Sequence, residues 1–213
     1  MARYTDAVCK LCRREEMKLF LKGERCFTEK CAYEKRPFSP GDKSKRGGRR
    51  QVSNYGQQLR QKQKVKRIYG VLERQFRNYF ARADRMKGVT GENLLRLLEM
   101  RLDNVVFRMG MAPSRKAARQ MVRHRHIAVN GRTVDIPSYQ VRVGDEIAVR
   151  ERDRSRQSQY VAAGRAVKGL GTTPDWVTQM DAKTFAGRVM SEPRRDHVDL
   201  AIEEHLIVEL YSK

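Results

Sequence analysis

The sequence lacks any run of about 18 consecutive apolar residues, which a membrane-spanning helix would require. Its first residues, MARYTDAVCKLC, contain no apolar segment of the signal-peptide kind, so we expect a cytoplasmic protein without membrane contact. The motifs G-x-x-x-x-G-K-[ST], G-x-S-x-G and H-E-x-x-H are absent. None of the four histidines stands beside a recognisable nucleophile. We therefore expect no catalytic residue and no enzymatic activity.

Acidic residues are scarce relative to basic ones. The chain has 25 Asp and Glu against 46 Lys and Arg in 213 residues, a formal net charge of +21. Its hydrophobic fraction of 39% lies below the usual range of about 45–50%. A small core with extended basic parts is typical of proteins that bind polyanions, because an acidic partner relieves the self-repulsion of the cations.

Cysteine occurs four times, always near the N-terminus, in the pattern C-x2-C, thirteen residues, C-x4-C. Structural disulfides are rare in the cytoplasm, and four clustered thiolates complete a tetrahedron around one ion. The pattern predicts a structural metal knuckle formed by Cys9, Cys12, Cys26 and Cys31. Zinc is the favoured ion, and an iron–sulfur cluster on the same four cysteines is the alternative. Two disulfides or four free thiols would explain the same four cysteines without a metal. With all four positions filled by sulfur, the metal would have no catalytic role.

Residues 35–50, KRPFSPGDKSKRGGRR, form a basic linker rich in glycine and proline. Seven of these residues are Lys or Arg, whereas only Asp42 is acidic. Such a segment is expected to order along a polyanion, and its candidate contacts are Arg46, Arg49 and Arg50.

Residues 57–85 are predicted to form one or two helices, with a possible break at Gly70. Apolar residues recur at helical spacing and indicate a buried face. They are Val65, Ile68, Leu72, Phe76, Tyr79 and Phe80. The start of this segment is strongly basic and is a second candidate contact with nucleic acid, through Arg60, Lys62, Lys64, Lys66 and Arg67.

Residues 94–149 are interpreted as a compact module of two helices and a short sheet. The leucine-rich stretch GENLLRLLEMRLDNVVFRMGM predicts the first helix, and Ser114 is expected to cap the second, SRKAARQMVRHRH. Asn130 and Gly131 indicate a hairpin turn, because both tolerate positive φ. A strand with a Gly144-Asp145 turn is expected to follow.

The second helix of this module carries an apolar face and, on another face, an arginine row at positions i, i+4 and i+8. Such a helix can bind a phosphate backbone, although a basic face in contact with solvent alone explains the same pattern. The candidate contacts are Arg115, Lys116, Arg119, Arg123 and His124. The acids Asp84, Glu99 and Asp103 are expected to be structural partners of arginine.

The predicted fold class is α+β. A mainly helical domain is expected to contain residues 51–91 and 155–213. The module at 92–154 would interrupt this domain, and the knuckle with its basic arm would occupy residues 1–50. Residues 197–211 are expected to form a helix that runs into an extended end. Late apolar residues such as Trp176 and Phe185 would pack on the helix at 65–80.

Four stretches of the chain resemble the bacterial family of small-subunit ribosomal protein four. They are MARYTDAVCKLCRREEMKLFLKGERC, KQKVKRIYGVLERQFRNYF, RLDNVVFRMGMAPSRKAARQMVRHRHIAVNGRTVDIPSYQVRVGD and EEHLIVELYS. The third stretch alone also resembles an RNA-binding module found in pseudouridine synthases, a tyrosyl-tRNA synthetase and a heat-shock protein. Many family members lack the full cysteine set, so this chain resembles the zinc-bearing branch.

This resemblance implies direct binding to small-subunit ribosomal RNA, at a helix junction in its 5′ domain, and nucleation of subunit assembly. It also implies an interface with the fifth small-subunit protein that influences translational accuracy, and neighbours near the messenger entry path. Because folded RNA is recognised mostly through its shape and backbone, we expect Arg119→Ala to weaken binding and lower its salt dependence by about one unit.

Two other functions fit parts of the sequence. An RNA-modifying enzyme can contain the same module, but it would need a catalytic domain, for which the basic flanks are too short. A DNA-binding zinc-finger regulator can contain a cysteine knuckle, but a C-x4-C half followed by a glycine-rich arm does not resemble a groove-reading finger. A turnover assay on RNA, and affinities for structured RNA and duplex DNA at matched salt, distinguish these alternatives.

Overall fold

The computed structural model describes residues 4–41, 53–151, 159, 161–163, 173–181, 183–198 and 201–212. Contacts divide the chain into two units. The helical unit contains Met1–Leu21, Arg25–Leu94 and Leu200–Lys213, and the mixed unit contains Lys22–Glu24 and Leu95–Asp199. The mixed unit is therefore inserted between two segments of the helical unit. No helix in the described residues has the length and hydrophobicity that a membrane span requires.

The helical unit contains α3 (Asn54–Ile68), α4 (Glu73–Asp84), the start of α5 (Thr90–Glu99) and α10 (Glu204–Tyr211). Ser53 caps α3 by accepting a hydrogen bond from the Gly56 N–H at 3.2 Å. The predicted break is confirmed, since Gly70 adopts a positive φ of 63° between α3 and α4. Because the chain changes direction there, Leu72 is exposed and not part of the predicted buried face.

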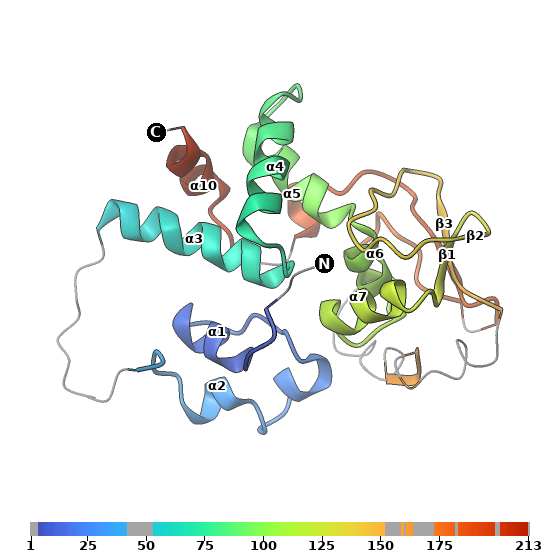
Figure 1. Ribbon diagram of the computed structural model, residues 1–213, viewed down its shortest axis with the longest axis horizontal. Helices are drawn as coiled ribbons and strands as arrows, with labels where there is room; N and C mark the ends of the chain where they lie inside the picture. Colours follow the sequence, from blue (N-terminus) through green and yellow to red (C-terminus); the bar gives the residue numbers. More distant parts are fainter. Residues whose placement is uncertain are drawn as a thin grey trace. The chain divides into compact units, whose positions relative to one another are not determined.

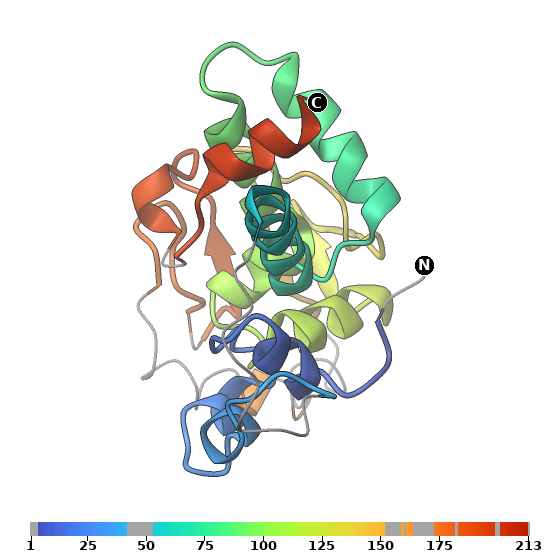
Figure 2. The same cartoon turned by 90° about the vertical axis from the view of Figure 1, so that its left-hand side faces the viewer.

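The helix α10 packs on α3 and α4 (Figures 1 and 2). The ring of Tyr211 stacks on Phe80, with ring centroids 4.5 Å apart, and lies 6.3 Å from Phe76. On α3, Gln58 donates a hydrogen bond to Glu209 at 2.9 Å. The end of the chain thus completes the helical core. The predicted helix with an extended end is not observed, because residues 201–203 have no regular secondary structure and α10 covers Glu204–Tyr211.

The knuckle region contains α1 (Cys9–Arg14), the 3-10 helix η1 (Gly23–Cys26) and α2 (Ala32–Lys35). Leu19 and Leu21 are buried between these short helices. Few apolar side chains are buried in this region, as expected for a knuckle with little core of its own.

The mixed unit continues from α5 into α6 (Leu102–Arg108), α7 (Arg115–Arg123), β1 (Ile127–Val129), β2 (Arg132–Thr133), β3 (Glu146–Val149) and β4 (Ala186–Arg188). The 3-10 helix η3 spans Arg195–His197. All strand pairs are antiparallel, in the order β2-β1-β3-β4. Figure 1 shows α6 and α7 beside these strands. The α+β fold class is confirmed.

The single leucine-rich helix predicted for residues 91–111 is wrong, because the chain breaks at Met100 and Arg101. Here the backbone pairs with the segment after β2. The Leu102 N–H donates to the Tyr139 carbonyl, and the Val141 N–H donates to the Met100 carbonyl, both at 2.9 Å. These hydrogen bonds replace those of a continuous helix, so α5 ends and α6 begins in a new direction.

Residues 173–198 belong to the mixed unit, whereas the sequence placed them in the helical domain. The strand β4 pairs with β3, and Trp176 and Val189 join the core that contains Met109 and Ile147. Gly187 permits this pairing, since an added Cβ would lie 3.0 Å from the Met109 sulfur. Hydrophobic periodicity did not predict that β4 pairs with β3, because β4 is only three residues long.

Candidate nucleic-acid interface

The basic helix α7 forms for the predicted local reasons. The Ser114 hydroxyl accepts a hydrogen bond from the Ala117 N–H at 3.3 Å, which caps the first turn. Ala118, Met121 and Val122 are buried in the core of the mixed unit. These residues anchor α7 in the core of the mixed unit.

Two members of the predicted arginine row are not free surface cations. Arg119 is only 7% exposed, and its guanidinium donates to the Asp103 carboxylate on α6 at 3.3 Å. Asp103 also accepts two hydrogen bonds from Arg101, at 3.0 and 2.8 Å. The α6 helix thus places a carboxylate opposite the row, and Arg119 is bound in the interior.

Arg115 is held by a second network around Glu99, whose side chain is fully buried. The Arg115 Nε donates to the Asn104 amide oxygen at 2.7 Å, and the Arg115 guanidinium lies 4.6 Å from the centre of the Phe107 ring. Glu99 accepts from Asn104 at 2.8 Å and from both nitrogens of the Arg108 fork at 2.9 Å. The expectation that Glu99 and Asp103 are structural partners of arginine is confirmed.

The exposed cations of α7 lie at its ends. Of the residues predicted as contacts, Lys116, Arg123 and His124 are exposed. Arg125 was not among the predicted contacts, yet its side chain is 70% exposed and its Nε donates to Asp135 at 3.1 Å. Its positive φ of 61° turns the chain from α7 into β1, and the sequence gives no signal of this geometry.

The hairpin after α7 adds a second exposed basic element. Asn130 and Gly131 adopt φ values of 48° and 76°, which confirms the predicted turn between β1 and β2. The Asn130 side chain donates to Asp145 at 2.8 Å and accepts from the Glu146 N–H at 2.9 Å. The hairpin is thereby fixed to the start of β3, and the exposed Arg132 on β2 pairs with Val129 next to the turn.

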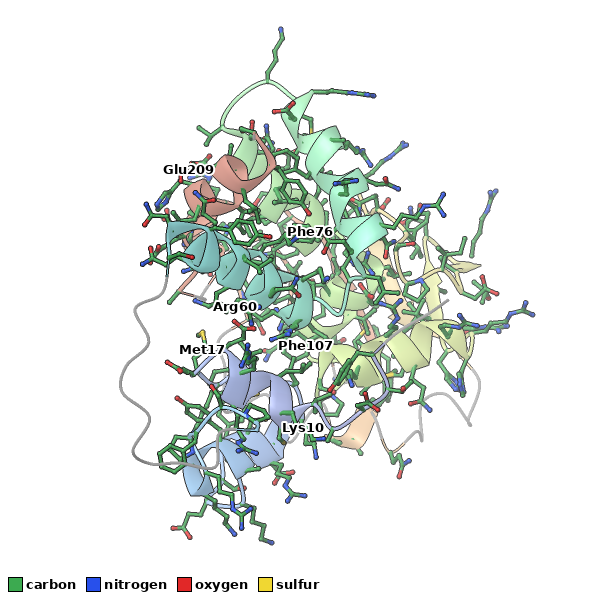
Figure 3. All side chains as sticks on the ribbon, turned by 60° about the vertical axis from the view of Figure 1, so that its left-hand side comes forward. Lys10, Met17, Arg60, Phe76, Phe107 and Glu209 are labelled. Carbon is green, nitrogen blue, oxygen red and sulfur yellow. The ribbon has the colours of Figure 1, made fainter. Side chains whose placement is uncertain are left out.

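The basic start of α3 is largely neutralised within the helical unit. Arg60 and Arg67 both bind Glu15, whose side chain is 1% exposed. Arg60 lies on the side of α3 that faces the knuckle (Figure 3). Burial raises the pKa of Glu15, although both arginines oppose this shift. The Lys64 ammonium donates to the Ala201 carbonyl at 3.3 Å.

The other two lysines of this group, Lys62 and Lys66, donate to Glu73 at the start of α4, at 3.0 and 2.8 Å. The Tyr211 hydroxyl donates to the same carboxylate at 2.9 Å. Burial opposes ionisation, but these three hydrogen bonds outweigh it and hold the pKa of Glu73 at about 2. Burial and the bond to Glu73 raise the pKa of Tyr211. The predicted contacts Arg46, Arg49 and Arg50 lie outside the described residues.

The four cysteines of the knuckle region form no disulfide with one another, and Cys12, Cys26 and Cys31 are buried. Burial raises the pKa of the Cys12 thiol, a hydrogen bond from the Leu19 backbone lowers it, and the other three cysteines raise it further. Four mutually interacting thiols suit a thiolate-bound ion. No group of three or more His, Cys, Asp or Glu in the described residues is arranged to hold a metal, so the zinc site stays a prediction.

Comparisons with known proteins cover the whole chain. Residues 3–99 match the family described as Ribosomal protein S4/S9 N-terminal domain, and residues 100–147 match the S4 domain. The chain is 57% identical over 213 residues to small ribosomal subunit protein uS4 of Desulforamulus reducens, with 100% of both chains covered. It is 55% identical over 215 residues to the protein of the same name from Thermoanaerobacter pseudethanolicus, again with 100% of both covered. The chain therefore belongs to the uS4 family of small-subunit ribosomal proteins.

Proposed function

We propose that the protein is a structural constituent of the small ribosomal subunit and that it binds small-subunit ribosomal RNA directly. The full-length similarity to uS4 proteins is the observation that carries this proposal. The exposed cations at the C-terminal end of α7 and in the following hairpin support it. Arg123, His124, Arg125 and Arg132 are exposed along a short stretch of chain that the core holds in place.

The buried ion pairs contribute rigidity to this surface. Arg119 and Arg115 tie α7 to α6 through Asp103, Asn104 and the Glu99 network. Because folded RNA is read mostly through its backbone and shape, a surface whose cations keep fixed spacing suits it better than mobile side chains. In this mechanism, Arg119 positions the helix and Arg123 contacts phosphate.

We also propose that Cys9, Cys12, Cys26 and Cys31 hold a structural zinc ion, with an iron–sulfur cluster as the alternative. A bound ion would supply folding energy on the order of 10 kcal/mol to a region with little core. Glu15 would then link the metal-organised knuckle to α3 through Arg60 and Arg67. The spacing of the four cysteines and the burial of Cys12, Cys26 and Cys31 support this assignment.

The family resemblance supports a more specific role. The RNA site would be a helix junction in the 5′ domain, and binding there would nucleate subunit assembly in the cytoplasm. A contact with the fifth small-subunit protein would influence translational accuracy, and other neighbours would lie near the messenger entry path. The protein would act by binding alone, without a reaction of its own.

Titration of full-length protein into a transcript of the 5′ domain tests the central proposal. We expect specific binding that weakens steeply with salt, because phosphate contacts release counterions. Co-sedimentation with small subunits in high salt is the second measurement. Absence of binding at near-physiological salt, or turnover of an RNA substrate, would contradict the proposal.

A further inference from the structure

The exposed side of α4 carries arginines that the sequence analysis did not single out. Arg74, Arg77, Arg82 and the helix-ending Arg85 are all exposed. At 100° per residue, Arg74, Arg77 and Arg85 fall within a stripe about 80° wide, and Arg82 lies about 60° outside it. We call Arg74, Arg77 and Arg85 the α4 ridge. It extends over roughly 16 Å, from the helical rise per residue.

The opposite face of α4 is firmly anchored in the helical unit. Phe76, Tyr79 and Ala83 are buried, and Phe80 stacks on Tyr211 of α10. Figure 3 shows Phe76 on the inner side of the helix. The backbone that carries the ridge is therefore held on α3 and α10, and its arginines keep a defined spacing.

Within the part of the chain that the structure describes, carboxylates pair with cations of α3, and no ion pair involves Arg74, Arg77 or Arg85. Glu15 and Glu73 engage four cations of α3. Glu73 belongs to α4, but its carboxylate is turned toward Lys62 and Lys66. The only other acid of α4 is Asp84, near its C-terminal end. The ridge consequently keeps a net positive charge.

The C-terminal end of α4 is also well defined. The Asn93 side chain donates to the carbonyls of Ala83, Met86 and Lys87 at 3.4, 3.5 and 3.2 Å. These bonds satisfy carbonyls at the end of α4 and hold the turn that carries the exposed Lys87. Cations at this end are also favoured by the helix dipole.

We infer that the α4 ridge is a contact surface for the sugar-phosphate backbone of ribosomal RNA. This inference rests on the proposed function and adds a second RNA-binding surface to that of α7. Ala81 is the other residue within the stripe, and Asn78 and the exposed Asp84 lie about 20° outside its two edges. Protein interfaces are centred on buried aromatic and apolar side chains, which this stripe lacks. A row of arginines suits phosphate oxygens, to which guanidinium groups donate paired hydrogen bonds.

The test compares two full-length variants with equal loss of charge. The ridge variant combines Arg74→Ala, Arg77→Ala and Arg85→Ala. The control variant combines Lys62→Ala, Lys64→Ala and Lys66→Ala on α3. The control also removes the lysine partners of Glu73, and the unpaired carboxylate would repel RNA. The control should therefore overestimate the effect of losing three charges, which makes the comparison stricter for the inference. Alanine favours helix, and circular dichroism checks that both variants fold.

Affinity for the 5′-domain transcript is measured over a series of salt concentrations. We expect the ridge variant to lose affinity on the order of tenfold or more, and its log–log salt slope to fall by about two to three units. The control variant should change much less. Equal losses in both variants would overturn the inference, because net charge alone would explain them.

Two further outcomes separate this inference from the proposed function. If wild-type protein does not bind the transcript, the proposed function fails. If the wild type binds and the ridge variant binds equally well, only the inference fails. A ridge variant that binds the transcript normally but no longer joins small subunits would also overturn the inference, in favour of a protein contact.

Discussion

Within the described residues, four carboxylates engage most of the cations of α3 and α7 that were predicted to contact RNA. Asp103 binds Arg101 and Arg119, and Glu99 binds Arg108 and approaches Arg115 at 4.0 Å. In the helical unit, Glu15 and Glu73 bind the four cations Arg60, Arg67, Lys62 and Lys66. Six of the residues predicted to contact RNA are thus engaged by acids within the protein, so their first role is structural.

Arg119 and Arg123 share α7 but should respond differently to alanine substitution. Arg119→Ala removes one partner of the buried Asp103, which keeps Arg101, so we expect a loss of about 1–3 kcal/mol in unfolding free energy. The salt slope of RNA binding by the Arg119→Ala variant should stay near that of the wild type. Arg123→Ala should leave stability unchanged and lower the slope by about one unit. Urea unfolding measures the stability and salt titration measures the slope. A lower slope with unchanged stability for Arg119→Ala would show that Arg119 contacts RNA.

The Glu73 cluster predicts a dependence of stability on pH. Its folded pKa of about 2 lies below its ordinary value of 4.5, so its stabilisation is complete above pH 4.5 and is lost as pH falls toward 2. Its side chain is 46% exposed, and after solvent screening we expect about 1 kcal/mol. Urea midpoints of wild type and Glu73→Gln should therefore differ at pH 6 and converge near pH 2. If the difference in urea midpoint stayed constant from pH 6 to pH 2, it would not arise from the ionised Glu73 carboxylate.

At the scale of elements, the knuckle and α10 depend on different sources of stability. The helix α10 buries Ile207 and stacks Tyr211 on α4, so ordinary packing holds it. The knuckle has short helices of four to six residues and buries few apolar side chains. Helices so short are not stable by themselves, which makes a bound ion the natural source of order.

Removal of the proposed metal with a chelator should unfold about the first forty residues and leave the remaining elements folded. Amide signals of α1 and α2 should collapse toward random-coil positions, whereas those of α4, α7 and β3 should stay in place. Cys12→Ser should have the same effect without chelator. Unchanged N-terminal signals in metal-free protein would refute a structural metal.

At the scale of the whole molecule, segments distant in sequence complete each core. The helical unit needs residues from both ends of the chain, and the mixed unit needs β4, about forty residues after β3. The buried Trp176 lies in the same apolar cluster as Met109, Ile147 and Val189. The S4 domain match ends at residue 147, before this part of the core.

Trp176→Ala should therefore destabilise the mixed unit by about 3–5 kcal/mol. Hydrogen exchange of the amides in β3 and β4 should accelerate accordingly. Trp176→Phe is the matched control, because the indole N–H has no hydrogen-bond partner among the described residues and little is lost with it. Equal exchange rates in wild type and the alanine variant would show that the core of β1 and β3 does not need this segment.

The sequence by itself determined the features that depend on neighbouring residues. The Ser114 cap, the Gly70 break and the Asn130-Gly131 turn follow from local backbone chemistry, and the charge of +21 indicated a polyanion partner. Only the tertiary structure decided which arginines face outward, where α5 ends and where β4 pairs. Helical spacing shows that Arg115, Arg119 and Arg123 lie along one side of α7, but not that α6 places Asp103 opposite one of them. The physical reason is that exposure depends on contacts between distant segments, and no local pattern contains them.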